Sequence, residues 1–582
     1  MLHETTMIQK TTAILFAILL TAAAVHSAPL EDDAVIFQAL EEEMARSLAD
    51  LKVDVFGPPY FITYQIRHHD RAEVAASFGA LILSDTHQAR TLFVDVKVGD
   101  PQFDSSFPES HRYSVEQFIP VDNDLDSLKR ALWYETDLRY KQAIVSFLRK
   151  KGRFISGVES HDLPDFSKGK SVRERIDPIP EWKLDIPGWE QLVRQISNLF
   201  KVAPGIEKSR VKIFSDRVIR YYYDSDGNKI RDAHLKYGLN IEAWTKTEEG
   251  TQLHDQKTLY FGKIDQFPSR AELTRTTLEL IASLKELKAA TPMDPYVGPA
   301  IFSPDATAVL FHEAIGHRLE GDRLRRDKDG KTFLKKIGQR ILPEFITVVD
   351  NPALKSYHGT PLIGHYHTDD QGQQSREVIL IDHGVLKSFL LSRTPVLGFN
   401  RTNGHARSDG VHPPMSRMSN FVVKSDLTLD AASLKQRLIE EVKKQNKPYG
   451  LFVKKIVGGE TQTDNRQFQV LKGKPLYLYK VFPDGREELV RGVDFVGTPL
   501  SIISKILVTG DDPTVINGFC TAESGVLPVA SITPSVLLSE VELQVSHQPQ
   551  VRRPILAPPK VVSAPWPPSQ TTAMGNRPPL LP

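Results

Sequence analysis

Residues 310–317 of this chain read Leu310-Phe311-His312-Glu313-Ala314-Ile315-Gly316-His317. Two histidines, with a glutamate directly after the first, are the side chains that a hydrolytic zinc site uses. The imidazoles hold the ion, and a carboxylate beside the open coordination position accepts a proton from bound water. We expect the β-rich second half of the chain to be built around the helix that carries this run.

The spacing of the two histidines departs from that of the commonest zinc proteases. In His-Glu-x-x-His the histidines are four residues apart, about 40° around a helix of 3.6 residues per turn, so both face one ion. His312 and His317 are five residues apart, which is about 140° around the same helix. We therefore predict that the helix bulges or ends between them, and that Gly316 permits the change. A helix end with solvated polar side chains is the alternative interpretation of so short a motif.

Length and composition indicate a globular protein of several domains. A chain of 582 residues is too long for one hydrophobic core, and usual domain sizes suggest about two to four units. The content of 40% hydrophobic and 25% charged residues is ordinary for a soluble globular protein. Since the formal net charge is +1, no overall field favours nucleic acid or an anionic membrane, and we expect no nucleic-acid partner.

The N-terminus has the pattern of a secretory signal peptide. Lys10 precedes the apolar run 13–25, and small residues follow it, so we expect cleavage near Ser27 or Ala28. An apolar run of about a dozen residues is short for a membrane span, which needs about 20. We assign residues 1–27 to a signal peptide and predict an exported protein, periplasmic or extracellular, without a stable membrane span. An uncleaved N-terminal anchor is the alternative.

Cys520 is the only cysteine of the chain. Exported proteins usually pair their cysteines, so a lone one is a free thiol, half of an intermolecular disulfide, or a metal-bound thiolate. A buried structural thiol is the plainest interpretation, because free cysteine often behaves as a small hydrophobic residue. A two-histidine site that needs a third ligand favours the thiolate.

The periodicity of the chain predicts an α+β fold. The first half is expected to contain helices at residues 34–51, 125–151, 189–200 and 270–290, and strands at 60–67, 77–84, 91–98, 209–224, 235–247 and 252–263. The second half is predicted as antiparallel, pseudo-barrel-like sheets that carry the metal-site helix, with strands that include 345–350, 375–382, 385–392, 421–424, 451–457, 468–472, 475–482, 488–493 and 535–545. We place an N-terminal α+β domain at 28–292, a β-rich C-terminal domain that carries the metal-site helix at 293–546, and a proline-rich disordered tail at 547–582.

Further short blocks occur in a characteristic order over about residues 295–545. They are Ser303-Pro304, Val309–His317, Leu319-Glu320-Gly321-Asp322, Thr347-Val348-Val349-Asp350, Asp369-Asp370-Gln371-Gly372, Gly384-Val385-Leu386-Lys387, Leu391-Ser392-Arg393, Pro414-Met415-Ser416-Arg417-Met418-Ser419-Asn420, Gly458-Gly459, Gly518-Phe519-Cys520 and Pro528-Val529-Ala530. In these blocks the chain resembles the TldD/PmbA metallopeptidases, also called modulator-of-gyrase proteins, on their motif-bearing TldD-like branch.

The resemblance implies that His312 and His317 bind zinc, that Cys520 supplies a third protein ligand, and that Glu313 is the catalytic carboxylate. It also implies hydrolysis of peptide bonds in unfolded or flexible peptides, which enter an enclosed dimer cavity and bind as an added strand. We therefore expect a zinc-dependent peptidase that forms a homodimer or a heterodimer with a family paralogue.

Two features depart from the family pattern. After Cys520 the family has a Gly- and Gln-rich stretch, whereas this chain has Thr521-Ala522-Glu523-Ser524-Gly525, which predicts an altered cleft around the metal. The chain is also longer than typical members and carries a signal peptide and a proline-rich tail. The substrates and partners of cytoplasmic relatives are therefore a poor guide here.

Other polar residues have weaker assignments. Glu320 and Asp322 are candidates to support the metal ligands, and a solvated helix flank is the alternative for each. Four histidines in polar, loop-like stretches are expected at the surface rather than on the metal: His358, His365, His367 and His405.

Two other functions are compatible with the motif. Cys520 could be the nucleophile of a cysteine hydrolase, with His312 or His317 as its base. A non-catalytic scaffold with a structural metal site is the other alternative, since structural zinc takes four protein ligands. Glu344 is then the spare carboxylate, either as the fourth ligand or in place of Cys520 as the third.

Overall fold

The computed structural model describes residues 30–53, 55–106, 115–156, 162–170, 172–326, 331–461, 471–546 and 556. The predicted signal peptide lies outside the described residues, and so does the predicted proline-rich tail apart from Leu556.

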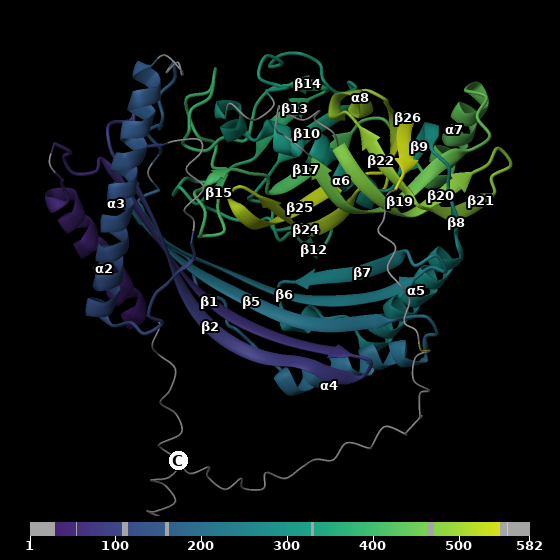
Figure 1. Ribbon diagram of the computed structural model, residues 1–582, viewed down its shortest axis with the longest axis horizontal. Coiled ribbons are helices and arrows are strands. Elements are labelled where there is room, and N and C mark those ends of the chain that lie inside the picture. The colour runs from purple at the N-terminus through teal and green to yellow at the C-terminus, as the bar shows by residue number, and fades with distance from the viewer. Residues whose placement is uncertain are drawn as a thin grey trace, which may run out of the picture.

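A long, curved sheet forms the first half of the fold (Figure 1). Its strands are β1 (Phe61–Ser77), β2 (Ala80–Lys97), β3 (Gln117–Phe118), β4 (Glu174–Ile176), β5 (Lys208–Asp224), β6 (Lys229–Lys246) and β7 (Gln252–Phe261). They lie in the order β3-β2-β1-β5-β6-β4, with β7 also paired to β6. The helices of this half are α2 (Leu30–Asp50), α3 (Leu125–Ile155), α4 (Ile186–Asn198) and α5 (Arg270–Ala289), with short 3₁₀ turns η2 (Leu199–Val202) and η3 (Ile264–Gln266).

Two apolar clusters hold the helices against this sheet. Helices α2 and α3 bury Leu40 and Leu132 against Tyr64 of β1 at one end of the sheet. Helices α4 and α5 bury Val193 and Leu280 in the second cluster, at the other end (Figure 1). The four predicted helices are confirmed. No helix among the described residues has the length and apolar character needed to cross a membrane.

One strand prediction in this half is wrong. The residues predicted as a strand at 77–84 contain the turn of the β1–β2 hairpin, where Phe78 and Gly79 have φ of 48° and 81°. The strands predicted at 60–67 and 91–98 are the far ends of the same two long strands. Because apolar residues lie on both sides of this tight turn, the sequence pattern hides it.

A closed barrel forms the centre of the second half. Its strands are β9 (Tyr296–Phe302), β19 (Gly450–Thr461), β20 (Leu471–Val481), β22 (Val493–Gly497) and β26 (Val536–Val545). They close because β22 pairs with both β20 and β26. The sheet is extended by β8 (Thr291–Pro292), β18 (Thr428–Leu429), β21 (Glu487–Arg491) and β23 (Ile506–Gly510). The associated helices are α6 (Pro304–Ala314), α7 (Ala431–Lys444) and α8 (Pro499–Ile503), with 3₁₀ turns η4 (Gly316–Leu319) and η5 (Gly321–Arg325).

A second sheet lies beside the barrel, in the order β14-β13-β10-β17-β25-β24. Its strands are β10 (Ile346–Asp350), β13 (Val378–Asp382), β14 (Val385–Leu386), β17 (Asn420–Ser425), β24 (Thr514–Ala522) and β25 (Gly525–Thr533), and two small ribbons add β11 (Ser356–Tyr357), β12 (Thr360–Pro361), β15 (Ala406–Arg407) and β16 (Met415–Ser416). The chain is therefore α+β, with a barrel-containing β-rich second half, as the sequence predicts.

The strand predictions for the second half are less complete. The hairpin β24–β25 is not among them, because Gly518, Gly525 and Pro528 interrupt its pattern. The strand predicted at 385–392 is wrong beyond Leu386. The runs predicted at 468–472 and 475–482 belong, within the described residues, to the single strand β20.

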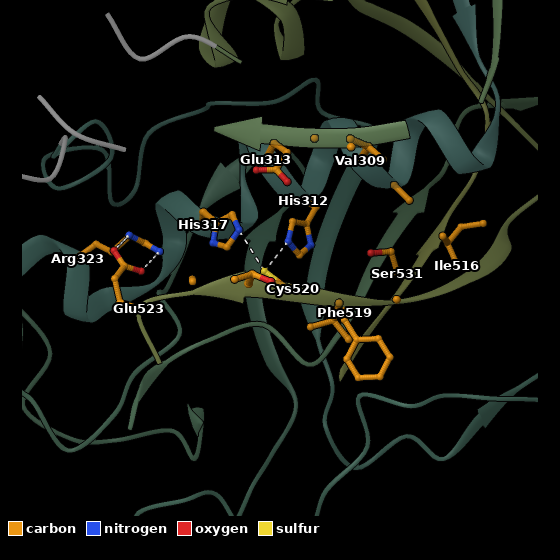
Figure 2. Close-up of a pocket in the computed structure, with 17 residues that line it drawn as sticks. Val309, His312, Glu313, His317, Arg323, Ile516, Phe519, Cys520, Glu523 and Ser531 are labelled. Atoms are coloured by element: carbon orange, nitrogen blue, oxygen red, sulfur yellow. Dashed lines mark hydrogen bonds and ion pairs between the residues drawn. The ribbon is translucent and has the colours of Figure 1, made fainter. Parts of the chain in front are cut away.

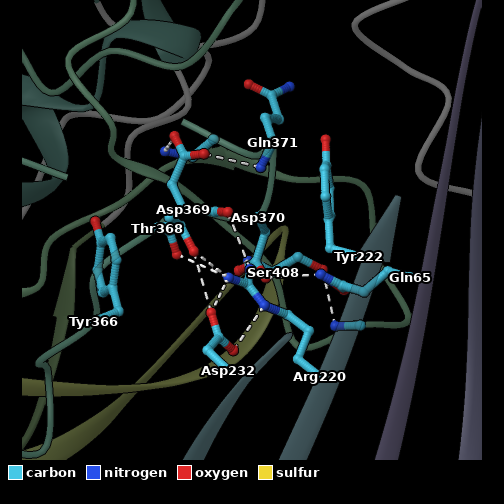
Figure 3. Close-up of polar contacts among 12 residues, drawn as sticks. Gln65, Arg220, Tyr222, Asp232, Tyr366, Thr368, Asp369, Asp370, Gln371 and Ser408 are labelled. Atoms are coloured by element: carbon cyan, nitrogen blue, oxygen red, sulfur yellow. Dashed lines mark hydrogen bonds and ion pairs between the residues drawn. The ribbon is translucent and has the colours of Figure 1, made fainter. Parts of the chain in front are cut away.

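A buried polar cluster joins the long sheet to the second half (Figure 3). Arg220 of β5 donates to Asp232 of β6 through Nε at 3.1 Å, and to Asp370 through Nη1 at 2.7 Å. It also donates to the backbone oxygens of Thr368 and Asp369, each at 3.0 Å. A buried ion pair is kept only if its donors and acceptors are matched, and here the partners of one guanidinium come from both halves of the chain.

We expect Arg220→Met to lower the free energy of unfolding by about 3–5 kcal/mol, because it leaves the buried Asp232 carboxylate without its arginine and leaves Asp370 with Arg67 in place of two arginines. Urea unfolding followed by tryptophan fluorescence would measure this. The matched control is Arg71→Met, which removes the half-exposed ion pair with Asp216 and should change the free energy by less than about 1 kcal/mol. Equal effects of the two substitutions would show that the buried cluster does not hold the halves together.

Candidate metal centre

Helix α6 positions the first predicted ligand. Ser303 caps it, accepting from the backbone N–H of Ala306 at 3.3 Å, and Pro304 stands in its first turn, where the missing N–H is not needed. The helix ends at Ala314, with His312 in its last turn, and the 3₁₀ turn η4 then carries His317. The prediction that the helix ends between the two histidines is confirmed.

Gly316 is required for a different reason from the one predicted. It does not adopt a left-handed φ, but a Cβ at this position would lie 2.0 Å from the sulfur of Met418. Met418 is buried in the core at 1% exposure. Glycine is therefore needed at position 316 because another side chain packs directly against its backbone.

Strand β24 brings Cys520 to the two histidines (Figure 2). The sulfur of Cys520 lies 3.1 Å from His312 Nε2 and 3.3 Å from His317 Nε2. The three donor atoms all lie within 4.8 Å of one another, and they form the one group of this kind among the described residues. The structure thus brings together all three predicted ligands.

The donor set fits a zinc ion. Tetrahedral coordination with ordinary Zn–N and Zn–S bond lengths places nitrogen and sulfur ligands about 3.6 Å apart. The observed separations of 3.1 and 3.3 Å require movements of only a few tenths of an ångström. Two imidazoles and one thiolate are also a set that zinc takes in catalytic sites, where a fourth position stays open.

The charges of the group favour a thiolate. Burial alone would raise the pKa of the Cys520 thiol, but the adjacent His317 and His312 lower that pKa to about 4. Burial opposes a charge on His317, whereas Glu320 and Cys520 raise the pKa of the imidazole to about 10. The Cys520 sulfur therefore carries the negative charge of this group. A thiolate is the form of cysteine that binds metals.

Glu320 supports His317, and Asp322 does not. Glu320 is fully buried, and its Oε1 lies 3.1 Å from His317 Nδ1. Despite burial, His317 and Arg323 hold the pKa of the Glu320 carboxyl well below its usual range. A carboxylate on Nδ1 leaves Nε2 of the same ring for a metal. Asp322 instead bonds the backbone of Ser416.

Glu313 lies beside a cavity of about 510 Å³ that also contains the three donors. Its carboxylate is on the opposite side of the imidazoles from Cys520 (Figure 2). Strand β19 passes over it at Gly459, where a Cβ would come within 2.8 Å of Glu313 Cγ. Gly459 therefore leaves the room that the Glu313 side chain occupies.

Glu523, in the stretch that departs from the family pattern, lies at the wall of the same cavity. It accepts from Arg323 at 2.6 and 2.7 Å and from Arg326 at 2.7 Å. Burial would raise the pKa of Glu523, but the two arginines lower it to about 2. This wall of the cleft is thus an ion-pair cluster.

The remaining predicted residues lie outside the centre. Glu344 is 78% exposed and pairs with Arg340, so it is neither a third nor a fourth ligand. His358 is exposed, and His365 and His367 are half-buried. The expectation that His405 lies at the surface is wrong, because it is fully buried against Asp350 at 3.1 Å. Its polar neighbours in sequence are themselves buried by loop packing.

Two further residues of the centre are not predicted from the sequence. Arg417 donates to the sulfur of Cys520 at 3.0 Å, and Arg323 donates to Glu320 at 2.7 Å. Arg417 stands within one of the resemblance blocks, which is the only signal that could have indicated it. Nothing in the local pattern marks Arg323.

The fold and the donor set together define a β-rich domain with a candidate metal site. Residues 296–545 match the family described as the PmbA/TldA metallopeptidase C-terminal domain. This part of the chain is similar to the metallopeptidases of the TldD/PmbA family.

Individual relatives agree with this assignment. A metalloprotease of Archaeoglobus fulgidus is 26% identical over 391 residues, covering 67% of this chain and 84% of that protein. A protein named zinc metalloprotease TldD homolog, of Saccharolobus solfataricus, is 27% identical over 365 residues, covering 60% and 75%. Matches with three other metalloproteases cover 64–65% of the relative's own length. The crystal structure of TldE from Thermococcus kodakarensis shares the fold, with a TM-score of 0.59 at 14% identity, covering 87% of this chain and 100% of that one.

Gly316→Ala should weaken metal binding, because the new methyl group must push apart Met418 and the turn that carries His317. We expect a loss of about 1–3 kcal/mol in stability, as for other overpacked cores, and lower zinc affinity by chelator competition. The double variant Gly316→Ala/Met418→Ala should recover zinc affinity relative to Gly316→Ala alone. Unchanged affinity in Gly316→Ala would mean that the close contact does not set the position of His317.

Proposed function

We propose that this protein is a zinc-dependent peptidase in which His312, His317 and Cys520 hold the metal and Glu313 is the general base. The observation that carries the proposal is the convergence of these three donors in a cavity that Glu313 also lines. The name of the Saccharolobus solfataricus relative, a zinc metalloprotease, supports zinc as the ion.

Zinc bound there supplies a Lewis acid that polarises a carbonyl and makes water a stronger acid near neutral pH. Glu313 takes the proton from the attacking water and can pass it to the leaving amine, as a carboxylate in reach of both can do. With zinc bound, Glu320 would accept from the Nδ1–H of His317 and leave Nε2 of the same ring for the metal.

The substrate proposal rests on two strand edges that border the cavity. β24 is the outermost strand of its sheet, and β19 has its pairing with β9 only over Leu451–Val453. Gly458 and Gly459, which follow the part of β19 that pairs with β9, line the cavity together with residues 518–522 of β24. An extended segment can add to such an edge through backbone hydrogen bonds. We therefore propose unfolded or flexible peptides as substrates, since a folded segment cannot present its backbone in this way.

The geometry favours this function over the two alternatives. Among the described residues only three donors converge, whereas a structural zinc site needs four. Cys520 is 6% exposed, and its sulfur contacts His312, His317 and Arg417. A cysteine nucleophile needs one base and an open approach, so this sulfur is better placed as a ligand.

Assembly and export remain predictions. The resemblance favours a homodimer or a heterodimer with a paralogue. The structural neighbour from Thermococcus kodakarensis is a TldE, and its name supports the proposal of a TldE-like partner. At 14% sequence identity, the similarity itself shows only a shared fold. The predicted signal peptide lies outside the described residues.

Two substitutions separate metal binding from catalysis. Cys520→Ala should lose zinc, because it removes the one anionic ligand. Glu313→Gln should keep zinc and lower kcat on an unstructured peptide by about 10²–10⁴-fold, the range of general base catalysis. Zinc content by atomic absorption and a fluorogenic peptide assay would measure both.

The result that would contradict the proposal is full turnover in Glu313→Gln with zinc retained, which would indicate a structural site. Activity that survives zinc removal but is lost on alkylation of Cys520 would instead support the cysteine hydrolase.

Gly518→Ala tests the proposed peptide path. Gly518 is on the same face of β24 as Cys520, because side chains alternate along a strand, and a Cβ there would meet no atom within 4 Å. The methyl group should therefore leave folding and zinc content unchanged but raise KM, since it projects into the cleft. Gly152→Ala in α3, where a Cβ is equally free of contacts, is the matched control and should leave KM unchanged. An unaltered KM in Gly518→Ala would place the peptide elsewhere.

A further inference from the structure

Arg417 lies directly against the donor group and is almost completely buried, with 1% of its side chain exposed. It stands between β16 and β17 in the sequence. Burying a guanidinium is unfavourable unless its donors are matched. The partners of Arg417 therefore show what the residue is placed to do.

Each nitrogen of the Arg417 side chain has a partner. Nη2 donates to the sulfur of Cys520 and to the Cys520 carbonyl oxygen, both at 3.0 Å. Nη1 donates to Ser524 Oγ at 3.0 Å. Nε pairs with Glu320 Oε1 at 3.2 Å, the same oxygen that lies 3.1 Å from His317 Nδ1. Arg417 thus contacts one proposed ligand directly and a second through a single shared oxygen.

The backbone around Arg417 is also fixed. Asp322 accepts from the N–H of Ser416 at 2.9 Å and donates its own N–H to Ser416 Oγ at 3.0 Å. Ser419 donates its N–H to Asp350 of β10 at 3.0 Å. The segment is therefore held to the turn that follows His317 and to the second sheet, so the guanidinium has little freedom to leave the sulfur.

We propose that Arg417 is a positioning residue of the metal centre, which orients the Cys520 sulfur and draws negative charge from it. The inference rests on the proposed zinc function. A cationic N–H donor on a thiolate takes up electron density that the sulfur would otherwise give to the metal. The zinc then stays more electrophilic than an unassisted thiolate would leave it, while the sulfur is held ready in place.

Cobalt substitution gives a readout that a merely structural arginine would not change. In the Co²⁺-loaded protein, the thiolate-to-metal charge-transfer band reports the electron density on sulfur. Arg417→Met removes the donors and keeps the length of the side chain. We expect this band to move to longer wavelength, and zinc affinity to fall about 10–100-fold, the usual effect of losing a residue that orients a metal ligand.

Arg323→Met is the matched control. Arg323 donates to Glu320, as Arg417 does, and pairs with Glu523, so its loss perturbs the same carboxylate and leaves the bond from Arg417 to Cys520 in place. We expect the band of Arg323→Met to stay at the wild-type wavelength. Arg417→Lys keeps the charge, but one nitrogen cannot reach Cys520, Ser524 and Glu320 together, so its band should shift in the same direction. If Arg417→Met does not fold, the Arg417→Lys variant is used for the test in its place.

The outcomes separate this inference from the proposed function. A wild-type protein that binds Co²⁺ with a thiolate band, together with Arg417→Met and Arg417→Lys bands at the wild-type wavelength, would overturn the role of Arg417 alone. A wild-type protein without any thiolate band would overturn Cys520 as a ligand, and the inference with it. An equal shift in Arg323→Met would assign the effect to Glu320 rather than to the bond on sulfur.

Discussion

The candidate metal centre depends on the close contact of the Cys520 sulfur with the imidazoles of His312 and His317, which lie 208 and 203 residues earlier in the sequence. Two constraints must be met together for this. Helix α6 must end at Ala314 so that His312 and His317 face the same point. Strand β24 must lie at the edge of its sheet, where it meets the end of that helix. The packing of Met418 on Gly316 links them, because the segment that carries Met418 and Arg417 also leads into the sheet.

The protein interior next to the donor group contains charged side chains that are paired with charges of opposite sign. Glu320 has Arg323 and Arg417 as partners, and Arg323 also pairs with Glu523. Replacing such a buried network by apolar side chains is often neutral or stabilising, so stability alone does not account for it. What the network provides is a fixed orientation for His317 and Cys520, which an apolar core could not supply. Violations of simple burial rules concentrate at functional sites for this reason.

Sequence patterns predicted the parts of the structure that depend on neighbouring residues. The amphipathic helices and most long strands follow from periodicity, and the break between His312 and His317 follows from helix geometry. Cys520 could be paired with them only because the chain has no other cysteine. Arg417, Arg323 and the burial of His405 could not be predicted, since each depends on contacts between segments distant in sequence. The β24–β25 hairpin is not predicted because Gly518, Gly525 and Pro528 interrupt the alternation that identifies strands, and Gly518 is also a residue of the cavity wall.

The stretch after Cys520 that departs from the family pattern contributes to the wall of the cleft and leaves the three donors together. Glu523 neutralises Arg323 and Arg326, so the wall of the cleft beyond His317 offers neither a free cation for a peptide carboxylate nor a free anion for an amino terminus. An unpaired charge at such a wall could bind the terminal carboxylate or amino group of a peptide substrate through a charge-assisted hydrogen bond, and so select for chain ends. With the charges at this wall paired to one another, the proposed recognition of a peptide rests on the edge of β24, where backbone groups that every residue carries can form hydrogen bonds. On the proposed function, we therefore expect cleavage within flexible segments rather than removal of terminal residues.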